Sequence, residues 1–183
     1  MVLSASASAE FQLKPLIGVA FGGDTTLTFG LPGAGTPSLA LGVGAVWVGE
    51  VFGVEGEIAH YAGFFEPNPN NVITQSGVTT FSGNIVVAMP ARMTKYTLRP
   101  YAIAGISQLR AHIETSLNAL PIQSNLAALD FGGGVTGFFS HHVGVNWDVR
   151  HVGSFGGHEN PPNSIGPEQV SLWRATMAAV IRF

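Results

Sequence analysis

WRATMAAVIRF, residues 173–183, alternates between two kinds of side chain. One face of this stretch is apolar and holds two alanines together with Trp173, Met177, Ile181 and Phe183. The opposite face carries Arg174 and Arg182. In a soluble sandwich the apolar face would point to a core and the arginines to water. In a membrane barrel the same two-residue repeat points its apolar face to lipid and its arginines into the lumen.

The composition favours the membrane interpretation. Charged residues make up 10% of the 183 residues, whereas an average soluble domain has about 25%. Hydrophobic residues make up 46%, and the mean hydropathy is +0.31. No uninterrupted apolar run reaches the length of about 18 residues that a spanning helix needs. Because lipid cannot satisfy backbone polar groups, only helices and closed barrels span membranes. The composition therefore favours a barrel.

Segments with a two-residue repeat recur along the chain, and the links between them are alternately long and short. The segments are residues 11–21, 38–48, 51–61, 78–89, 96–112, 125–139, 142–152 and 168–183. The long links are residues 22–37, 63–77, 113–124 and 153–167, and the short turns lie near Glu50, Arg92 and His141. The pattern predicts an all-β fold, a single eight-stranded antiparallel transmembrane up-and-down β-barrel. Its short turns would be periplasmic and its long loops external.

Five short motifs carry a resemblance to a known superfamily. They are GVAFGGD (residues 18–24), GVEGEIAHY (53–61), RPYAIAG (99–105), DFGGGV (130–135) and the terminal Arg182-Phe183. Together they resemble the small eight-stranded outer-membrane barrels of the outer-membrane-protein-A-like and opacity-protein-like superfamily. The resemblance implies a location in the bacterial outer membrane, contact with its lipid, and contact with the barrel-assembly machinery during biogenesis. Its assembly signal would be the terminal strand with Trp173, Met177, Ile181 and Phe183.

Most charged residues fall on the less apolar faces of the segments. This group comprises Lys14, Glu55, Glu57, Asp130, Asp148, Arg150, Arg174 and Arg182. The interior of an eight-stranded barrel is about wide enough for side chains to fill it. Because an isolated buried charge is costly, we expect these charges to pair as a polar network in the lumen. The alternative is a narrow gated pore, in which Glu55 and Glu57 face arginines as a removable plug.

Two groups of residues invite a catalytic or metal-binding interpretation. His141 and His142 are adjacent, so on a strand they would point to opposite faces and would not chelate one ion. His151, Ser154 and Glu159 lie near the outer end of the seventh segment, where a lipid hydrolase could place its catalytic residues. The spacing between His151 and Ser154 puts the two on opposite faces unless a bulge intervenes. We therefore expect no enzyme, no metal site and no cofactor, and the zero cysteines exclude thiolate ligands.

The aromatic residues suggest belts at the two membrane interfaces. Trp47, Tyr96 and Tyr101 lie near short turns, and Phe64 and Phe65 lie near a long link. The faces of the fifth segment remain open, because Arg99 and Tyr101 share one face while Ala102 and Ala104 share the other.

The expected domain organisation is a single barrel domain over residues 10–183. Residues 1–9, MVLSASASA, would be a signal-peptide remnant or a disordered N-terminus. The expected role is structural or in surface interaction, with an extracellular ligand bound through the long loops, and we expect a monomer. The alternatives are a narrow channel or carrier for small or hydrophobic solutes, a rim lipid hydrolase, and a soluble lipocalin-like barrel. The net charge of −3 gives no reason to expect nucleic acid as a partner.

Overall fold

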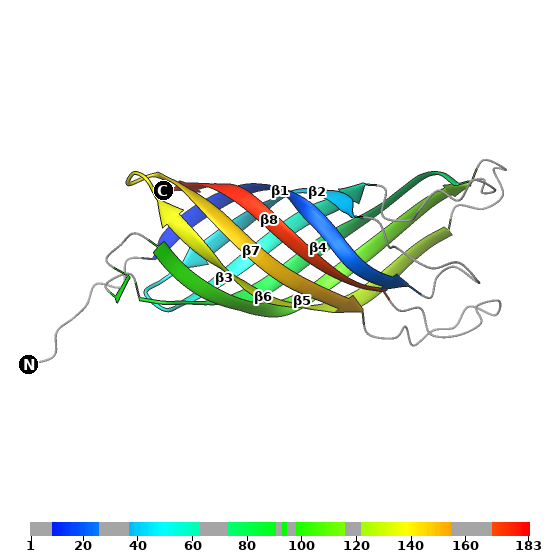
Figure 1. Ribbon diagram of the computed structural model, residues 1–183. Coiled ribbons are helices and arrows are strands. Elements are labelled where there is room, and N and C mark those ends of the chain that lie inside the picture. The colour runs from blue at the N-terminus through cyan, green and yellow to red at the C-terminus, as the bar shows by residue number, and fades with distance from the viewer. Residues whose placement is uncertain are drawn as a thin grey trace, which may run out of the picture.

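The fold is a closed barrel in which each strand is antiparallel to its neighbours (Figure 1). The computed structural model describes residues 9–25, 37–62, 73–90, 93–94, 98–115, 122–154 and 170–183. The strands are β1 (Glu10–Thr25), β2 (Ser38–Val48), β3 (Phe52–Ala62), β4 (Ile73–Ala88), β5 (Leu98–Thr115), β6 (Ile122–Phe138), β7 (Val143–Ser154) and β8 (Val170–Arg182). Each strand pairs with the next in sequence, and β8 pairs back with β1.

The predicted fold class and strand order are therefore confirmed, whereas several strand ends are not. β4 begins at Ile73 instead of residue 78, and β5 continues to Thr115. The reason is that β4 and β5 remain paired as far as Ile73 and Thr115. The alternation of apolar and polar residues fades there, so the sequence pattern does not mark this extension. β1, β6 and β7 also extend into the predicted long links, because β1 ends at Thr25, β6 begins at Ile122 and β7 ends at Ser154. Most other residues of these links lie outside the described residues.

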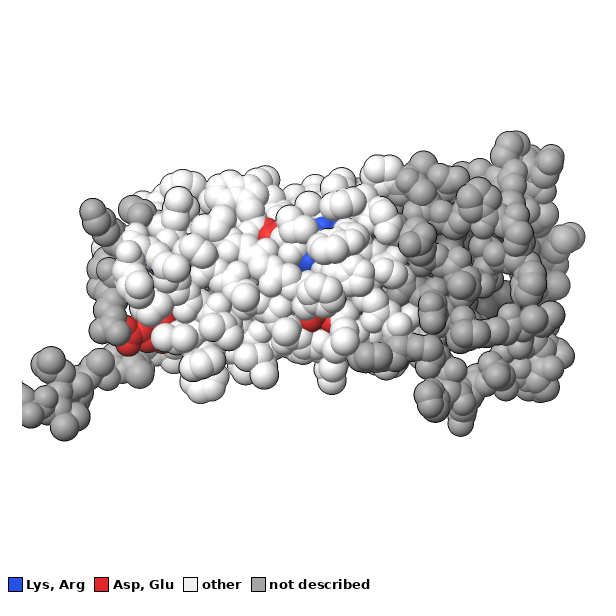
Figure 2. Space-filling model, turned by 60° about the horizontal axis from the view of Figure 1, so that its bottom comes forward, with Lys and Arg blue, Asp and Glu red and all other residues white. Residues whose placement is uncertain are grey.

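The two faces of each strand differ sharply in exposure. On β2, Leu39, Leu41 and Trp47 point outward and are exposed, whereas Ala40 and Val46 are buried in the lumen. The same alternation runs through β3 and β7. Figure 2 shows an outer surface almost without charged residues on the face it presents. An exposed apolar band around buried charges is the reverse of what a soluble lipocalin-like barrel needs, so the fold contradicts that alternative.

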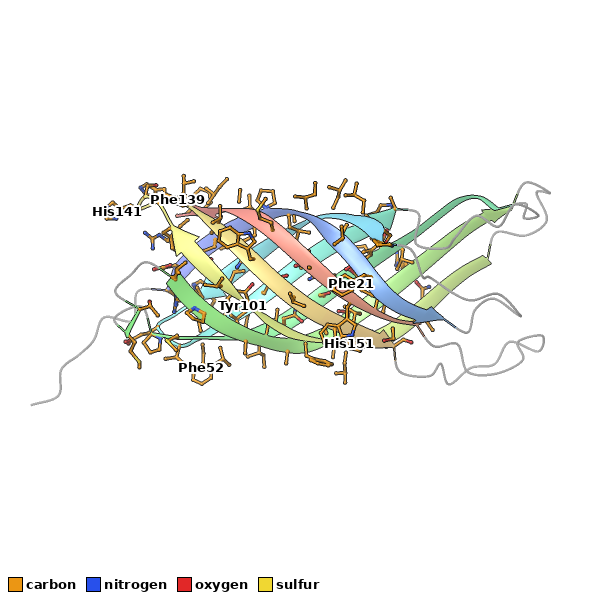
Figure 3. All side chains as sticks on the ribbon, in the orientation of Figure 1. Phe21, Phe52, Tyr101, Phe139, His141 and His151 are labelled. Atoms are coloured by element: carbon orange, nitrogen blue, oxygen red, sulfur yellow. The ribbon has the colours of Figure 1, made fainter. Side chains whose placement is uncertain are left out.

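The model also settles the faces of β5. Tyr101, Ile103 and Leu109 point inward, whereas Ala102 and Ile106 point outward. The interpretation of Tyr101 as a residue of an interfacial belt is therefore wrong, and Figure 3 shows its side chain within the barrel. Its hydroxyl group finds partners in the lumen, which the outer surface would not provide.

The other residues of the expected aromatic belts are only partly described. Trp47 is 61% exposed next to the first short turn, on the outer face as expected. Tyr96, Phe64 and Phe65 lie outside the described residues.

Closure of the barrel joins the two ends of the chain. Leu13 pairs with Ile181 and Val19 with Ala175. The backbone N–H of Phe183 donates a hydrogen bond of 2.9 Å to the carbonyl oxygen of Phe11, and the centres of the two rings lie 5.9 Å apart. The start of β1 and the end of β8 therefore lie at the same end of the barrel as the short turns (Figure 1).

Within the described residues, no helix combines the length and the apolar character needed to cross a membrane.

Candidate functional site

Side chains fill the lumen in three layers. The outer half, towards the long links, is closed by buried apolar residues, which are Ala20, Ala40, Ala59, Tyr61, Val78, Leu109, Leu126, Ala128, Val152 and Leu172. The half near the short turns is closed by Val46, Val48, Val86 and Ala88, against which Tyr101 packs. The charged residues lie between these two apolar layers. This central ionic layer is the candidate functional site.

Arg150 of β7 is the centre of the ionic layer. Its guanidinium Nη1 lies 2.6 Å from Glu55 Oε1, 3.4 Å from Glu57 Oε2 and 3.8 Å from Asp130 Oδ2. Its Nη2 donates a hydrogen bond of 2.7 Å to Asp148 Oδ2. The side chain of Arg150 is 0% exposed. One fully buried cation therefore neutralises carboxylates from three strands, namely β3, β6 and β7.

Two further cations, from β1 and β8, belong to the layer. Lys14 of β1 pairs with Glu55, and Arg174 of β8 pairs with Glu57. Arg174 also donates a hydrogen bond of 3.2 Å to the hydroxyl oxygen of Tyr61. Each glutamate of β3 thus lies between two cations, so the removal of one carboxylate would leave two buried cations less well compensated.

Neutral side chains that the sequence interpretation missed complete the layer. Asp148 accepts hydrogen bonds from the Thr176 hydroxyl group at 2.6 Å and from the Tyr101 hydroxyl group at 3.0 Å. The amide of Asn84 donates to Glu55 at 3.3 Å and to Asp130 at 3.4 Å. All of these residues lie on inward faces, so the face assignment of each strand is the signal that could have found them.

Glycines leave space for the large side chains of the lumen. A Cβ atom on Gly134 would lie 2.3 Å from the carbonyl oxygen of Trp147 and 2.8 Å from the Tyr101 hydroxyl oxygen. A Cβ atom on Gly105 would lie 2.3 Å from Asn84 Oδ1. The glycines of the motifs DFGGGV and RPYAIAG therefore have a steric role, because a larger residue at either position would displace a member of the ionic layer or the backbone beside it.

Arg182 lies apart from the other seven residues of the predicted network. Its side chain is 23% exposed at the end of the barrel, where it lies 3.4 Å from Glu10 and 4.4 Å from the ring of Phe138. Lys14, Glu55, Glu57, Asp130, Asp148, Arg150 and Arg174 do meet in the lumen. Arg182 differs because it is the last residue of β8, one layer below the ionic centre.

The layer leaves little open space on the side of the short turns. A cavity of about 20 Å³ lies beside Lys14 and Tyr101, which is room for about one water molecule. Below it, the guanidinium group of Arg99 donates hydrogen bonds to the carbonyl oxygens of Gly49, Glu50 and Met89 at 2.7, 2.8 and 3.0 Å. Among the described residues, this arrangement can hold the lumen closed on the side of the short turns.

His141, His142 and His151 lie outside the lumen. His141, which Figure 3 labels, and His142 are exposed in the turn between β6 and β7, and His142 Nδ1 lies 3.1 Å from the carbonyl oxygen of Arg182. His151 points outward, with its ring 5.0 Å from Phe131 and 4.9 Å from Trp173. Its Nε2 lies 3.0 Å from Ser171 Oγ, so its hydroxyl partner is Ser171 and not Ser154. Ser154 is on the other face of β7, and Glu159 lies outside the described residues.

The arrangement of the strands can be compared with known structures. Neisserial surface protein A aligns with a TM-score of 0.62 at 14% identity, over 97% of this chain and 99% of that protein. The outer membrane protein OprG from Pseudomonas aeruginosa aligns with a TM-score of 0.61 at 11% identity, over 97% of each chain. The fold is that of the small eight-stranded outer-membrane barrels.

A third barrel of this fold is the outer membrane protein W of E. coli, with a TM-score of 0.54 at 15% identity, over 97% of this chain and all of that protein. No family model and no curated protein matches the sequence. At these low identities the likeness concerns the arrangement of the strands.

Proposed function

We propose that this protein resides in the bacterial outer membrane as a barrel with a closed lumen and has a structural or surface-interaction role. The observation that carries the proposal is the position of Arg150, which is fully buried at the barrel centre and contacts Glu55, Glu57, Asp130 and Asp148. A solute that crossed the lumen would have to separate these pairs and also pass two apolar layers. Separation of a buried pair leaves an uncompensated charge, which is costly.

A surface-interaction role agrees with the arrangement of the strand ends and of the charged residues. The strand ends that lead into the long links lie at one end of the barrel, and the ionic layer lies inside it, so variable recognition would be a property of those links. A barrel of the same fold, the attachment invasion locus protein Ail of Yersinia pestis, has been solved with the heparin analogue sucrose octasulfate. That complex supports the idea that such a barrel can present a binding surface without a large pore.

The proposal is tested by conductance in planar lipid bilayers. The purified wild-type protein should give little or no steady conductance. The double variant Glu55→Gln, Glu57→Gln should be clearly less stable, and a small leak should be its only new current. A matched control is Glu10→Gln, Glu50→Gln, which removes the same two charges at the end of the barrel. This control should change neither property. Large, stable wild-type currents would contradict the closed lumen.

A narrow channel or a carrier for small solutes is the second candidate, and one observation favours it. Arg174 Nε and Nη2 and Asp130 Oδ1 are buried without a hydrogen-bond partner among the described residues. Such atoms attract water, so a rearranged ionic layer could become hydrated. This candidate predicts wild-type conductance steps whose ion preference reverses in the Glu55→Gln, Glu57→Gln variant while stability changes little.

We do not propose a hydrolase. His151 and Ser171 have the geometry of a hydrogen-bonded pair, but a base in a catalytic triad needs a third group on its other ring nitrogen. Nδ1 of His151 has no hydrogen-bond partner among the described residues. Two aromatic rings hold the histidine at the outer surface, which fits an interfacial belt.

A further inference from the structure

One charged residue departs from the rule that charges lie in the lumen or at the barrel end. Arg110 of β5 points outward and is exposed. Among the Lys and Arg side chains that the structure describes, it alone lies on the outer face of the strands. Its guanidinium carbon lies 5.6 Å from the centre of the Phe81 ring, which leaves its N–H groups free to bind an anion beside an apolar surface.

Arg110 belongs to a row of polar side chains across four strands. His60 pairs with Thr79, Thr79 with Arg110, and Arg110 with Asn125. His60 Nδ1 lies 3.0 Å from Thr79 Oγ1, and Arg110 and Asn125 are exposed on the outer face. A second outward row, across β6, β7, β8 and β1, is aromatic, with Phe131, His151, Trp173 and Phe21 as successive partners. The outer surface therefore carries one polar row over β3–β6 and one aromatic row over the strands that follow.

An apolar groove runs from this polar row towards the middle of the barrel. It has a volume of about 790 Å³, and its walls include Ile58, Phe81, Gln108 and Asn125. Gly56 and Gly83 pair with each other at its inner end, and a Cβ atom on either would meet nothing within 4 Å. The groove exists because two outward positions that carry large apolar side chains elsewhere on the barrel are glycines here.

The length of the groove along the barrel axis, and its position on that axis, match one leaflet of a bilayer. A tilted strand rises about 2.5 Å per residue along the barrel axis. Arg110 lies twelve residues from Leu98 at the start of β5, which places it about 30 Å from the short-turn end. Gly83 lies five residues from the end of β4, which is about 13 Å from that end. The apolar band of such barrels is about 25 Å tall, so Arg110 lies at its outer edge and Gly83 near its middle.

From this combination we propose that the outer face of β3–β6 is a binding site for a phosphorylated lipid of the outer leaflet. The phosphate group binds Arg110 with help from Asn125 and Gln108, and an acyl chain lies in the groove down to Gly56 and Gly83. The occupant is a lipid because the anion site and the apolar groove are continuous and share the orientation of a lipid in the outer leaflet. The inference rests on the proposed outer-membrane location.

Native mass spectrometry of the purified full chain in neutral detergent tests the site. The probes are lipid A with both phosphates and the same lipid without them. The wild type should retain one copy of the phosphorylated lipid preferentially. Arg110→Gln should weaken this binding by roughly tenfold or more, with no change for the dephosphorylated lipid. Gly83→Leu, whose Cβ atom would meet nothing within 4 Å and whose side chain would occupy the groove, should weaken the binding of both lipids.

The control for the groove is Ala179→Leu, which introduces the same side chain at an outward position of β8 on the other side of the barrel. This variant should bind both lipids as the wild type does. Equal binding by the wild type and Arg110→Gln would overturn the proposal, and so would equal losses in Gly83→Leu and Ala179→Leu. Full displacement of the lipid by inorganic phosphate would show an anion site without a lipid site. A dimer that Gly83→Leu abolishes would show that a second copy occupies the groove.

A failure of the lipid-site proposal can be distinguished from a failure of the proposed outer-membrane location. Binding in detergent does not depend on where the protein resides in the cell, whereas fractionation of cells reports the location directly. A protein that fractionates with the outer membrane but binds both lipids equally would remove only the lipid site.

Discussion

At the scale of single residues, Arg150 has the most consequential environment in the molecule. It contacts carboxylates at 2.6, 2.7, 3.4 and 3.8 Å and is completely buried. We expect Arg150→Met to lower the free energy of unfolding by about 3–5 kcal/mol, because it leaves buried carboxylates uncompensated. Urea unfolding of the protein folded into lipid vesicles measures this.

Arg182→Met provides the comparison for Arg150. This arginine is partly exposed at the barrel end, where it lies 3.4 Å from Glu10 and donates a hydrogen bond of 2.6 Å to the carbonyl oxygen of His141. Its replacement should cost about 1–2 kcal/mol, less than the loss in Arg150→Met. Equal losses of unfolding free energy in Arg150→Met and Arg182→Met would mean that the buried ion pairs stabilise the barrel no more than the partly exposed pair does.

The outward residues give a second prediction, which depends on depth in the membrane. Val149 and Val143 both point outward from β7 and have similar exposure, 47% and 50%. Val149 lies six residues into the strand and Val143 is its first residue. An arginine at Val149 should therefore destabilise the folded barrel by about 2–4 kcal/mol, and one at Val143 by about 0–1 kcal/mol.

The shift of the unfolding midpoint in vesicles, followed by heat-modifiable gel migration, measures both valine variants. If Val149→Arg and Val143→Arg cost the same, the apolar band would not lie where the strand alternation places it.

At the scale of elements, Arg99 connects the start of β5 with the turn between β2 and β3. Its three hydrogen bonds reach carbonyl oxygens of Gly49, Glu50 and Met89. Because Arg99 is only partly buried, we expect Arg99→Gln to cost about 1–2 kcal/mol of unfolding free energy. Arg99→Lys keeps the charge but not the planar fork of donors, so it should recover only part of this loss. Full recovery with lysine would indicate that charge alone matters.

The last strand suggests a prediction about biogenesis. Phe183 is 73% exposed and contacts Phe11 at the barrel end, so its ring contributes only about 0.5–1.5 kcal/mol to the folded state. If this residue is an assembly signal, Phe183→Ala should reduce the amount of folded barrel in cells far more than it reduces the stability of refolded protein. Phe139→Ala, at an equally exposed turn phenylalanine, is the matched control and should assemble normally.

The sequence could predict the strands, because a strand in contact with lipid must alternate outward apolar side chains with inward ones. Strand ends beyond the apolar band, such as residues 73–77, could not be predicted in this way. The same distinction holds in the lumen. Charges such as Glu55 and Arg174 are conspicuous on a mostly apolar chain. The neutral Asn84 stands out only as a member of an inward face, and the alternation around Tyr101 left the faces of its segment open.

At the scale of the whole molecule, the absence of cysteine from the sequence makes the proposed orientation easy to test. Pro37 and Glu50 are exposed at opposite ends of β2. In intact cells a membrane-impermeant thiol reagent should label Pro37→Cys, while Glu50→Cys should react only after the outer membrane is permeabilised. Labelling of Glu50→Cys from outside would reverse the orientation.

The partners of Arg150 also bear on the speed of unfolding. Arg150 and Glu55 are separated by 95 residues in sequence, and the charges come from β1, β3, β6, β7 and β8. Apart from the pair with Asp148 on the same strand, the pairs of Arg150 join β7 to β3 and β6, so the complete layer can form only when the sheet has curled round towards closure. Contacts that form after the rate-limiting step of folding act mainly on the unfolding rate. The ionic layer should therefore slow unfolding. We expect Arg150→Met to shorten the lifetime of the folded barrel, while the folding rate stays nearly the same.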